Sequence, residues 1–218
     1  MLSPPPVVIV LAAGLGQRFT GAGHKLAQML ADDEGSGRAA TVLTLTLRHA
    51  VASRMPVLVV TTNELAPLAG EEVATRDMLV LPDAAPSRGR GMGDSIAAGV
   101  AARANASGWV LLPADMPRVK PSTLVAVAAA LEQHAVAFAQ HQGRRGHPVA
   151  FAAELYSELI GLTGDEGARR LVARYPSHPV EVDDPGVLID IDTTEDLDEL
   201  RSGVDSGFKP SAFSPPIY

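Results

Sequence analysis

The chain has 218 residues, of which 46% are hydrophobic and 20% are charged, and its formal net charge is −7 at pH 7. A chain of this size buries a core without disulfides or metal staples, and its length suits one large domain better than two. The negative charge argues against broad binding to nucleic acids or to anionic membranes. Because the sequence contains no cysteine, thiol nucleophiles, cysteine-zinc sites and a disulfide framework are excluded.

Two features of the sequence bear on where the protein is found. The first residues, Met1–Pro6, lack the basic region of a secretory signal. In addition, no apolar stretch approaches the roughly 18 residues that are needed to cross a bilayer. We therefore expect a cytoplasmic protein that does not enter membranes.

The first two thirds of the chain alternate between strand-like and helix-like segments. Apolar runs typical of buried strands occur at Val7–Leu11, Val57–Val60, Leu79–Leu81 and Val110–Leu112. Helix-like segments occur at Thr41–Ala52, Ser95–Ala104 and Ser122–Gln133. This alternation predicts βαβ units and an α/β fold with a mainly parallel sheet. The acidic, glycine-rich segment Ala31–Ala40 is expected to be a surface loop.

The last third of the chain has weaker signals. The expected strands are Ala135–Gln140 and Val149–Phe151, on either side of a turn at Gly143–Gly146, and Val187–Ile191. The expected helices are Gly167–Tyr175 and Leu197–Arg201, each preceded by a sequence with capping-box spacing. We predict a single domain over residues 1–201, followed by an extended tail at 202–218.

The first predicted strand runs into a glycine-containing loop, Leu11-Ala12-Ala13-Gly14-Leu-Gly16-Gln-Arg18. Small residues let the backbone approach a ligand, and exposed N–H groups at such a turn hold phosphate oxygens. Arg18 and Lys25 add cationic donors near this loop. A tight turn with solvated basic residues explains the same pattern equally well. The loop is neither a dinucleotide fingerprint, which needs glycine at Phe19, nor a P-loop, since Lys25 precedes Leu26.

Two aspartates follow predicted strands, at the edge where open α/β sheets bind ligands. Asp115 follows Val110–Leu112, and Asp192 follows Val187–Ile191. Their carboxylates are ligands that Mg²⁺ prefers. A local turn before Pro117 also explains Asp115, and helix capping by Asp192 or Thr193 explains the second position.

Two further loops carry polar groups. Ser95, near the start of a helix, is a candidate for binding a base or ribose, or a helix cap. The basic turn Gly143–Pro148 is either a solvated loop or a site for an anionic acceptor. A serine hydrolase with Ser95 as its nucleophile is disfavoured, because Ala97 stands where the nucleophile elbow requires glycine.

Taken in order, these segments resemble the molybdenum cofactor nucleotidyltransferases of the MobA-like NTP transferase family. The similar segments span about residues 7–200. They are Leu11-Ala-Ala-Gly14-x-Gly16-x-Arg18, Lys25-Leu26, Gly91-Met-Gly-x-Ser95, Leu112-Pro-Ala-Asp115-Met-Pro117, Gly146-His-Pro148, Gly164-Asp-x-Gly167-Ala-Arg169 and Asp190-Ile-Asp192-Thr-x-Glu-Asp196-Leu197. The paired alanines are most similar to the cytidylyltransferase branch, which makes molybdopterin cytosine dinucleotide.

The resemblance implies a Rossmann-like, three-layer nucleotidyltransferase fold and a role for each motif. It implies nucleotide binding by the first loop, with Arg18 and Lys25 on the phosphates, and by Gly91 and Ser95. It implies Mg²⁺ at Asp115 and Asp192, with Arg18, Lys25 and Asp115 catalytic. It places the acceptor near His147, Asp165 and Arg169. The implied partners are an NTP, in particular CTP, molybdopterin or another phosphorylated small molecule, and a molybdoenzyme or maturation factor.

The expected reaction is attack by the acceptor's phosphate on the α-phosphorus of CTP, with release of pyrophosphate. A phosphate monoester is already ionised near neutral pH, so neither a general base nor a covalent enzyme intermediate is required. The alternatives are a guanylyltransferase, a sugar- or alditol-phosphate nucleotidyltransferase of the same fold, and a non-catalytic cofactor-binding module.

Overall fold

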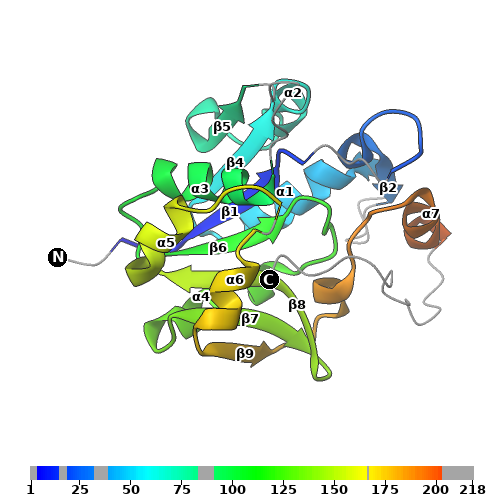
Figure 1. The fold of residues 1–218 in the computed structure, drawn as a ribbon. Helices are drawn as coiled ribbons and strands as arrows, with labels where there is room; N and C mark the ends of the chain where they lie inside the picture. Colours follow the sequence, from blue (N-terminus) through cyan, green and yellow to red (C-terminus); the bar gives the residue numbers. More distant parts are fainter. Residues whose placement is uncertain (1–3, 15–18, 32–38, 83–90, 166, 203–218) are drawn as a thin grey trace.

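A seven-stranded sheet forms the centre of the molecule, and helices cover both of its faces (Figure 1). The computed structural model describes residues 4–14, 19–31, 39–82, 91–165 and 167–202. The strand order is β5-β4-β1-β6-β8-β7-β9. The strands are β1 (Val7–Ala12), β4 (Val57–Thr62), β5 (Met78–Leu81), β6 (Gly108–Pro113), β7 (Val136–His141), β8 (Arg144–Ala152) and β9 (Ser177–Glu181). The predicted α/β class is confirmed.

Strand direction decides which loops meet at one edge of the sheet. β1 pairs in parallel with both β4 and β6, and β5 pairs in parallel with β4. β8 is antiparallel to its neighbours β6 and β7, and β9 is parallel to β7. The loops after β1 and β6 therefore lie at the same edge, and the chain that begins β8 reaches that edge too. This is the mainly parallel sheet that the sequence predicts.

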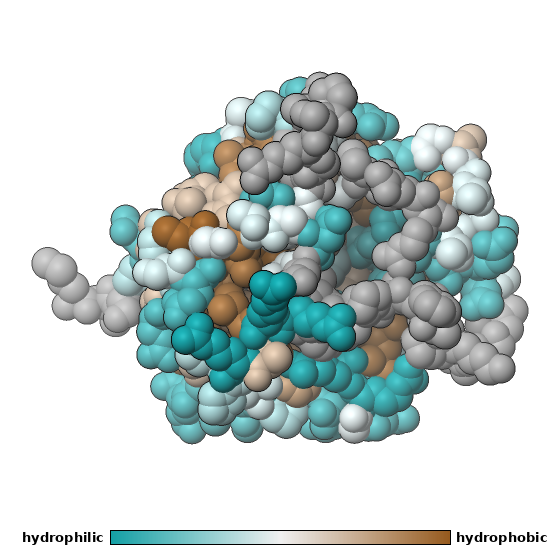
Figure 2. All heavy atoms as spheres, in the orientation of Figure 1, coloured by the Kyte–Doolittle hydropathy of each residue, from teal (hydrophilic) through white to brown (hydrophobic). Residues whose placement is uncertain are grey.

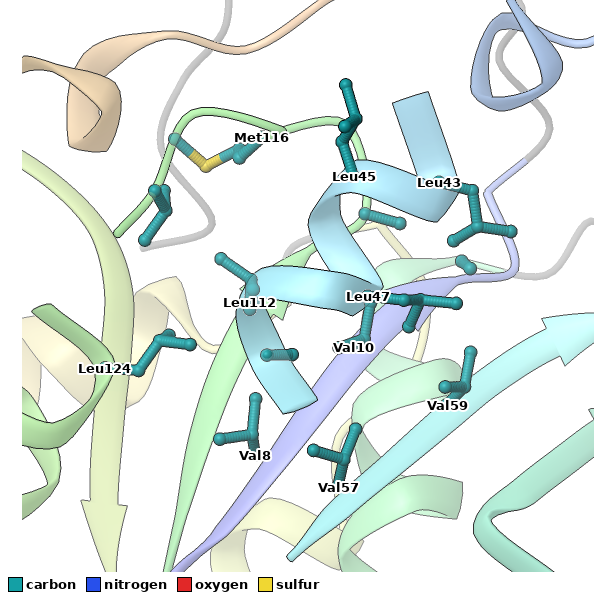
Figure 3. Close-up of a cluster of buried hydrophobic side chains, with 14 of the residues drawn as sticks. Val8, Val10, Leu43, Leu45, Leu47, Val57, Val59, Leu112, Met116 and Leu124 are labelled. Carbon is teal, nitrogen blue, oxygen red and sulfur yellow. The ribbon is translucent and has the colours of Figure 1, made fainter. Parts of the chain in front are cut away.

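The strands are apolar along their whole length because both faces are buried. In β1, Val8 and Val10 pack into one hydrophobic cluster, while Ile9 and Leu11 pack into another. The first cluster lies under α1 (Val42–Ala52) and α4 (Pro121–Ala129), and Figure 3 shows its side chains between α1 and the sheet. The second cluster lies under α3 (Met92–Ala102), α5 (Tyr156–Ile160) and α6 (Arg169–Arg174). The result is three layers, helix-sheet-helix.

The helix boundaries follow local capping chemistry. The Thr41 hydroxyl accepts a hydrogen bond from the Thr44 N–H at 3.1 Å, so α1 begins one residue after the threonine. Pro121 occupies the first turn of α4, where its missing N–H costs nothing. The predicted helix at 122–133 ends early, and a 3₁₀ turn, Ala130–Glu132, completes it.

Several short elements are not predicted by the sequence. The two ends of the expected loop at 31–40 pair with neighbouring residues as an antiparallel ladder, β2 (Met29–Ala31) with β3 (Ala39–Thr41). The helix α2 (Ala66–Ala69) is a single turn. The last helix, α7 (Thr194–Ser202), begins three residues before the predicted one and contacts β2.

One predicted strand is wrong. The sequence predicts a strand over Val187–Ile191, but Pro185–Leu188 form a 3₁₀ turn, and residues 189–191 join no ladder with the described residues. The Asp184 carboxylate accepts from the Gly186 N–H at 3.0 Å, and a Cβ at Gly186 would lie 2.1 Å from the Arg118 carbonyl oxygen. This capped turn and close approach divert the chain away from the sheet. The edge position is taken by β9, which contains Pro179, as an edge strand tolerates.

Within the described residues, no helix is both long enough and apolar enough to span a membrane.

Candidate active site

Asp115 lies just beyond β6, in a loop that three hydrogen bonds hold in place. The Ala114 N–H donates to the Leu11 carbonyl at 3.2 Å, which ties the loop to the end of β1. The Ile191 N–H donates to the Asp115 carbonyl at 3.0 Å. The buried Thr46 hydroxyl, from α1, lies 2.9 Å from the Ala114 carbonyl oxygen. The backbone on both sides of the carboxylate is therefore fixed.

The ammonium group of Lys25 lies between two carboxylates that are far apart in the sequence. Its Nζ donates to Asp115 Oδ2 at 2.6 Å and to Asp192 Oδ1 at 3.0 Å. All three side chains are largely buried, with exposed fractions of 13%, 18% and 6% respectively. The predicted pair of carboxylates is thus assembled, with a cation between them.

Electrostatics favours the charged form of Lys25. Burial by itself lowers the pKa of an ammonium group. Here the charges of Asp115 and Asp192, together with their hydrogen bonds, outweigh burial and raise the pKa of Lys25 above its ordinary value. The lysine therefore stays protonated, and the cluster carries one positive and two negative charges.

Asp192 does not cap the helix that follows it, because Thr193 and Asp196 do so. The Thr193 hydroxyl accepts from the Asp196 N–H at 3.2 Å, and the Asp196 carboxylate accepts from the Thr193 N–H at 2.8 Å. These reciprocal bonds form a capping box at the start of α7. Because Thr193 and Asp196 cap the helix, the Asp192 carboxylate is directed to Lys25 instead.

The residues at this cluster suit a hard divalent cation. Among the described residues, the buried Oδ1 of Asp115 has no hydrogen-bond partner, although its Oδ2 binds Lys25. No group of three or more potential His, Cys, Asp or Glu ligands occurs in the described part of the chain. Two carboxylates without histidine or thiolate match Mg²⁺ or Mn²⁺, which take their other ligands from phosphates and water.

His147 is buried on β8, immediately before a cis peptide bond to Pro148. Burial lowers the pKa of His147 to about 4; the Asp115 charge opposes this shift and the Arg145 charge adds to it. The imidazole is therefore neutral near neutral pH. β6 and β8 pair as far as Leu111 with Val149, so Asp115 and the predicted acceptor residue His147 both lie just beyond this end of the ladder.

The glycine-containing loop begins at the same edge of the sheet. Leu11, Ala12 and Ala13 are buried as β1 ends, whereas Gly14 is exposed. A Cβ on Gly14 would meet no described atom within 4 Å. Gly16 and Arg18, which carry part of the predicted nucleotide site, lie outside the described residues.

A histidine that sequence reasoning did not single out connects this loop to Lys25. His24 Nδ1 accepts from the Leu26 N–H at 3.1 Å, which leaves the proton on Nε2 to be donated to the Gly14 carbonyl at 3.2 Å. The residue before Lys25 thus holds the start of the glycine loop.

The predicted nucleotide and acceptor segments meet at the start of α3. A Cβ at Gly91 would lie 2.0 Å from the Gly164 carbonyl carbon, so only glycine permits this approach. The Asp94 carboxylate accepts from the N–H groups of Gly91 and Gly164, at 2.9 and 3.1 Å. Ser95 is buried, and its hydroxyl lies 3.4 Å from the Gly91 carbonyl oxygen.

The predicted acceptor residues beyond this junction are open to solvent. Asp165 and Arg169 are both exposed, and Arg169 begins α6. Exposed arginines 169, 170 and 174 make α6 basic, and Figure 2 shows hydrophilic residues over this part of the face. The structure thus brings Lys25, Asp115, Asp192 and His147 together and sets Asp165 and Arg169 on an accessible surface.

Comparisons with known proteins agree with this architecture. The chain is 33% identical over 215 residues to the purine catabolism protein PucB of Bacillus subtilis strain 168, covering 92% of this chain and 98% of PucB. It is 27% identical to Rv0371c from Mycobacterium tuberculosis H37Rv, whose crystal structure aligns over 93% of this chain and 100% of that one with a TM-score of 0.75.

Two further comparisons add a metal complex and the family itself. A crystal structure of Rv0371c in complex with manganese is 26% identical, covers 92% of this chain and 100% of that one, and has a TM-score of 0.70. The family model for the MobA-like NTP transferase domain matches residues 8–180. The sequence resemblance is therefore confirmed: the chain belongs to the MobA-like NTP transferase family and is a nucleotidyltransferase.

Proposed function

We propose that this protein transfers CMP from CTP to the phosphate monoester of a small acceptor, molybdopterin, in a Mg²⁺-dependent reaction that releases pyrophosphate. The observation that carries the proposal is the buried cluster in which Lys25 lies between Asp115 and Asp192. Two carboxylates and a lysine at the ligand-binding edge of the sheet suit a reaction between two phosphates, whose repulsion requires compensating positive charge.

The metal assignment rests on the ligands that the cluster offers. Asp115 and Asp192 would hold Mg²⁺ through carboxylate oxygens, and the unpartnered Oδ1 of Asp115 is one such oxygen. Mg²⁺, when bound, neutralises phosphate charge and polarises the phosphorus that is attacked. The manganese complex of Rv0371c supports this choice, because Mn²⁺ shares the preference for oxygen ligands.

Each residue of the site has its own role in the proposed transfer reaction. The backbone N–H of Gly14, just past the end of β1, would donate to a phosphate oxygen, while Asp115 and Asp192 would hold the cation. Lys25, once released from the carboxylates, donates to the phosphates and stabilises the departing pyrophosphate. Neutral His147 adds no charge to its surroundings and offers a hydrogen bond on the acceptor side. Catalysis comes from positioning and charge neutralisation.

The choice of CTP and molybdopterin comes from the motif resemblance. The paired alanines Ala12 and Ala13 are similar to the cytidylyltransferase branch, whereas the guanylyl branch tends to have glycine there. The name of PucB assigns that relative to purine catabolism and specifies neither a nucleotide nor an acceptor. Specificity is therefore the part of the proposal that an assay must decide first.

The test is a screen of pyrophosphate release. CTP, GTP and ATP are each incubated with the protein, with and without molybdopterin, and with and without Mg²⁺. We expect release only when CTP, molybdopterin and Mg²⁺ are all present. Equal or faster release with GTP would identify a guanylyltransferase. Release from CTP when a sugar or alditol phosphate is supplied in place of molybdopterin, and not with molybdopterin, would replace the acceptor. Binding of molybdopterin without release from any nucleotide would identify a cofactor-binding module.

A further inference from the structure

Two consecutive arginines, Arg144 and Arg145, begin β8, and their side chains leave opposite faces of the sheet. Adjacent residues of a strand alternate in direction. Arg145 pairs with Gln140, two residues beyond Phe138, whereas Arg144 pairs with His141. The Arg145 guanidinium lies 3.9 Å from the centroid of the Phe138 ring, on the face covered by α3, α5 and α6. Arg144 therefore belongs to the other face.

The position of Arg145 connects it to the cluster around Asp115. β8 is antiparallel to β6, so the start of β8 lies at the edge where the loop after β6 carries Asp115. The ladder pairs Leu111 with Val149, and Asp115 follows Leu111 by four residues just as Arg145 precedes Val149 by four. Arg145 is exposed, whereas Lys25, Asp115 and His147 are largely buried. Arg145 thus stands where the site opens to solvent.

The charges of the buried cluster and of the two substrates indicate a role for Arg145. The buried cluster has two carboxylates and one ammonium group, so Lys25 is already matched by negative charge. The incoming nucleotide is an anion, and the acceptor phosphate carries a charge between −1.5 and −2 at about pH 7. A second anion approaching on the His147 side therefore needs its own cation. A guanidinium offers a planar fork that matches phosphate, and its stacking on Phe138 limits its freedom before binding.

We propose that Arg145 binds the phosphate monoester of the acceptor and thereby selects anionic acceptors, an inference that rests on the proposed function. Arg144, which has the same charge one residue away, does not take part because it lies on the opposite face. Arg145 thus acts on the acceptor, while Lys25 and the glycine loop act on the nucleotide.

The two arginines provide a matched pair of variants, Arg145→Gln and Arg144→Gln. We expect Arg145→Gln to raise both the KM and the Kd for molybdopterin by about tenfold or more. This is the effect expected when a hydrogen bond to a charged group is lost. The KM for CTP and the thermal midpoint should stay unchanged. For Arg144→Gln we expect changes of about twofold or less in every quantity, as for an ordinary surface substitution. Arg145→Lys should recover part of the affinity, because it restores the charge without the fork.

The measurements separate failure of this inference from failure of the proposed function. Molybdopterin binding is measured by titration calorimetry in the presence of Mg²⁺ and a CTP analogue with a methylene bridge between the α- and β-phosphorus, independently of turnover. Equal weakening by the two substitutions, or a rise only in the KM for CTP, would overturn the role of Arg145 while the transfer reaction stands. Wild-type binding without CMP transfer would overturn the proposed function, and the arginine comparison would still decide the inference. Absence of wild-type binding would overturn both.

Discussion

The ammonium nitrogen of Lys25 lies 2.6 Å from Oδ2 of Asp115, on the same carboxylate whose other oxygen, Oδ1, is offered to a divalent cation. An ammonium group on one oxygen of a carboxylate repels a metal ion on the other oxygen, because the two cations then lie close together. A divalent cation at this site would therefore compete with Lys25 for the pair of carboxylates unless phosphates took the lysine. This competition makes the behaviour of the protein without nucleotide informative.

Replacing the lysine should strengthen metal binding in the absence of nucleotide. In Lys25→Met the two carboxylates lose their internal cation, so we expect the Kd for Mn²⁺ to fall by about tenfold or more. Turnover should fall at the same time, because the phosphates lose a donor. Electron paramagnetic resonance of free Mn²⁺ measures the affinity. Lys120→Met is the control, since the Lys120 ammonium donates to the Asp183 carbonyl. If Lys25→Met bound Mn²⁺ no more tightly than wild type, the competition would be refuted.

Loss of either carboxylate should reduce turnover while the fold is kept. We expect Asp115→Asn to lower kcat/KM by at least about 100-fold, since charge stabilisation by a metal contributes several kcal/mol. Asp192→Asn should also be impaired. Turnover is measured against Mg²⁺ concentration for each variant, with circular dichroism as the folding control and exposed Asp183→Asn as the matched substitution. Full activity of Asp115→Asn with unchanged magnesium dependence would remove Asp115 from the metal site.

The hydroxyl of Thr46 should position Asp115 without touching substrate. It lies 2.9 Å from the Ala114 carbonyl and 3.0 Å from the Val42 carbonyl. Thr46→Val keeps the shape but leaves a buried carbonyl without its donor, so we expect a loss of about 1–3 kcal/mol in the free energy of unfolding. We also expect weaker Mn²⁺ binding, and recovery of both properties in Thr46→Ser. A stability loss with unchanged Mn²⁺ affinity would reduce Thr46 to a purely structural role.

The neutral state of His147 should make folding sensitive to pH in the metal-free protein. Its pKa is about 4 in the folded chain and 6.5 as a free side chain, so between these values the unfolded chain binds more protons. Stability is therefore complete above pH 6.5 and is lost as the pH falls towards 4, by up to about 1.4 kcal/mol per pH unit. Urea unfolding at pH 7 and pH 5 measures this. His147→Gln should show a smaller difference between the two pH values, and an identical difference would contradict the assignment.

The fold was predictable where one local signal sufficed. Continuous apolar runs identify β1, β4 and β6, because strands covered on both faces need no alternation. The sequence Ser177–Glu181 has no such pattern, since an edge strand pairs on one side and is partly exposed, so β9 was missed. At Val187–Ile191 the apolar residues serve a capped turn, which the pattern alone does not distinguish from a strand.

The site was predictable in its members and not in its contacts. The positions of Asp115 and Asp192 after apolar runs identify both carboxylates, but the ion pair between Lys25 and Asp192 spans 167 residues of sequence. A contact over this separation depends on the whole fold, so no local spacing reveals it. The role of Thr46 is also invisible in the sequence, where it is an ordinary helix residue. Only the packing of α1 in the fold brings its hydroxyl to the Ala114 carbonyl.

The reversal of β8 has a consequence for how this architecture diversifies. The loops after parallel strands are fixed by the crossovers that follow them, whereas β7 and β8 are joined by a two-residue turn, Gln142-Gly143, with φ angles of 51° and 75°. Substitutions along this hairpin alter one wall of the site and leave the segments bearing Gly14, Lys25 and Asp115 intact. Variant libraries with substitutions only at residues 140–147 would therefore change which phosphorylated acceptor the enzyme uses. Its preference among nucleotides would stay the same.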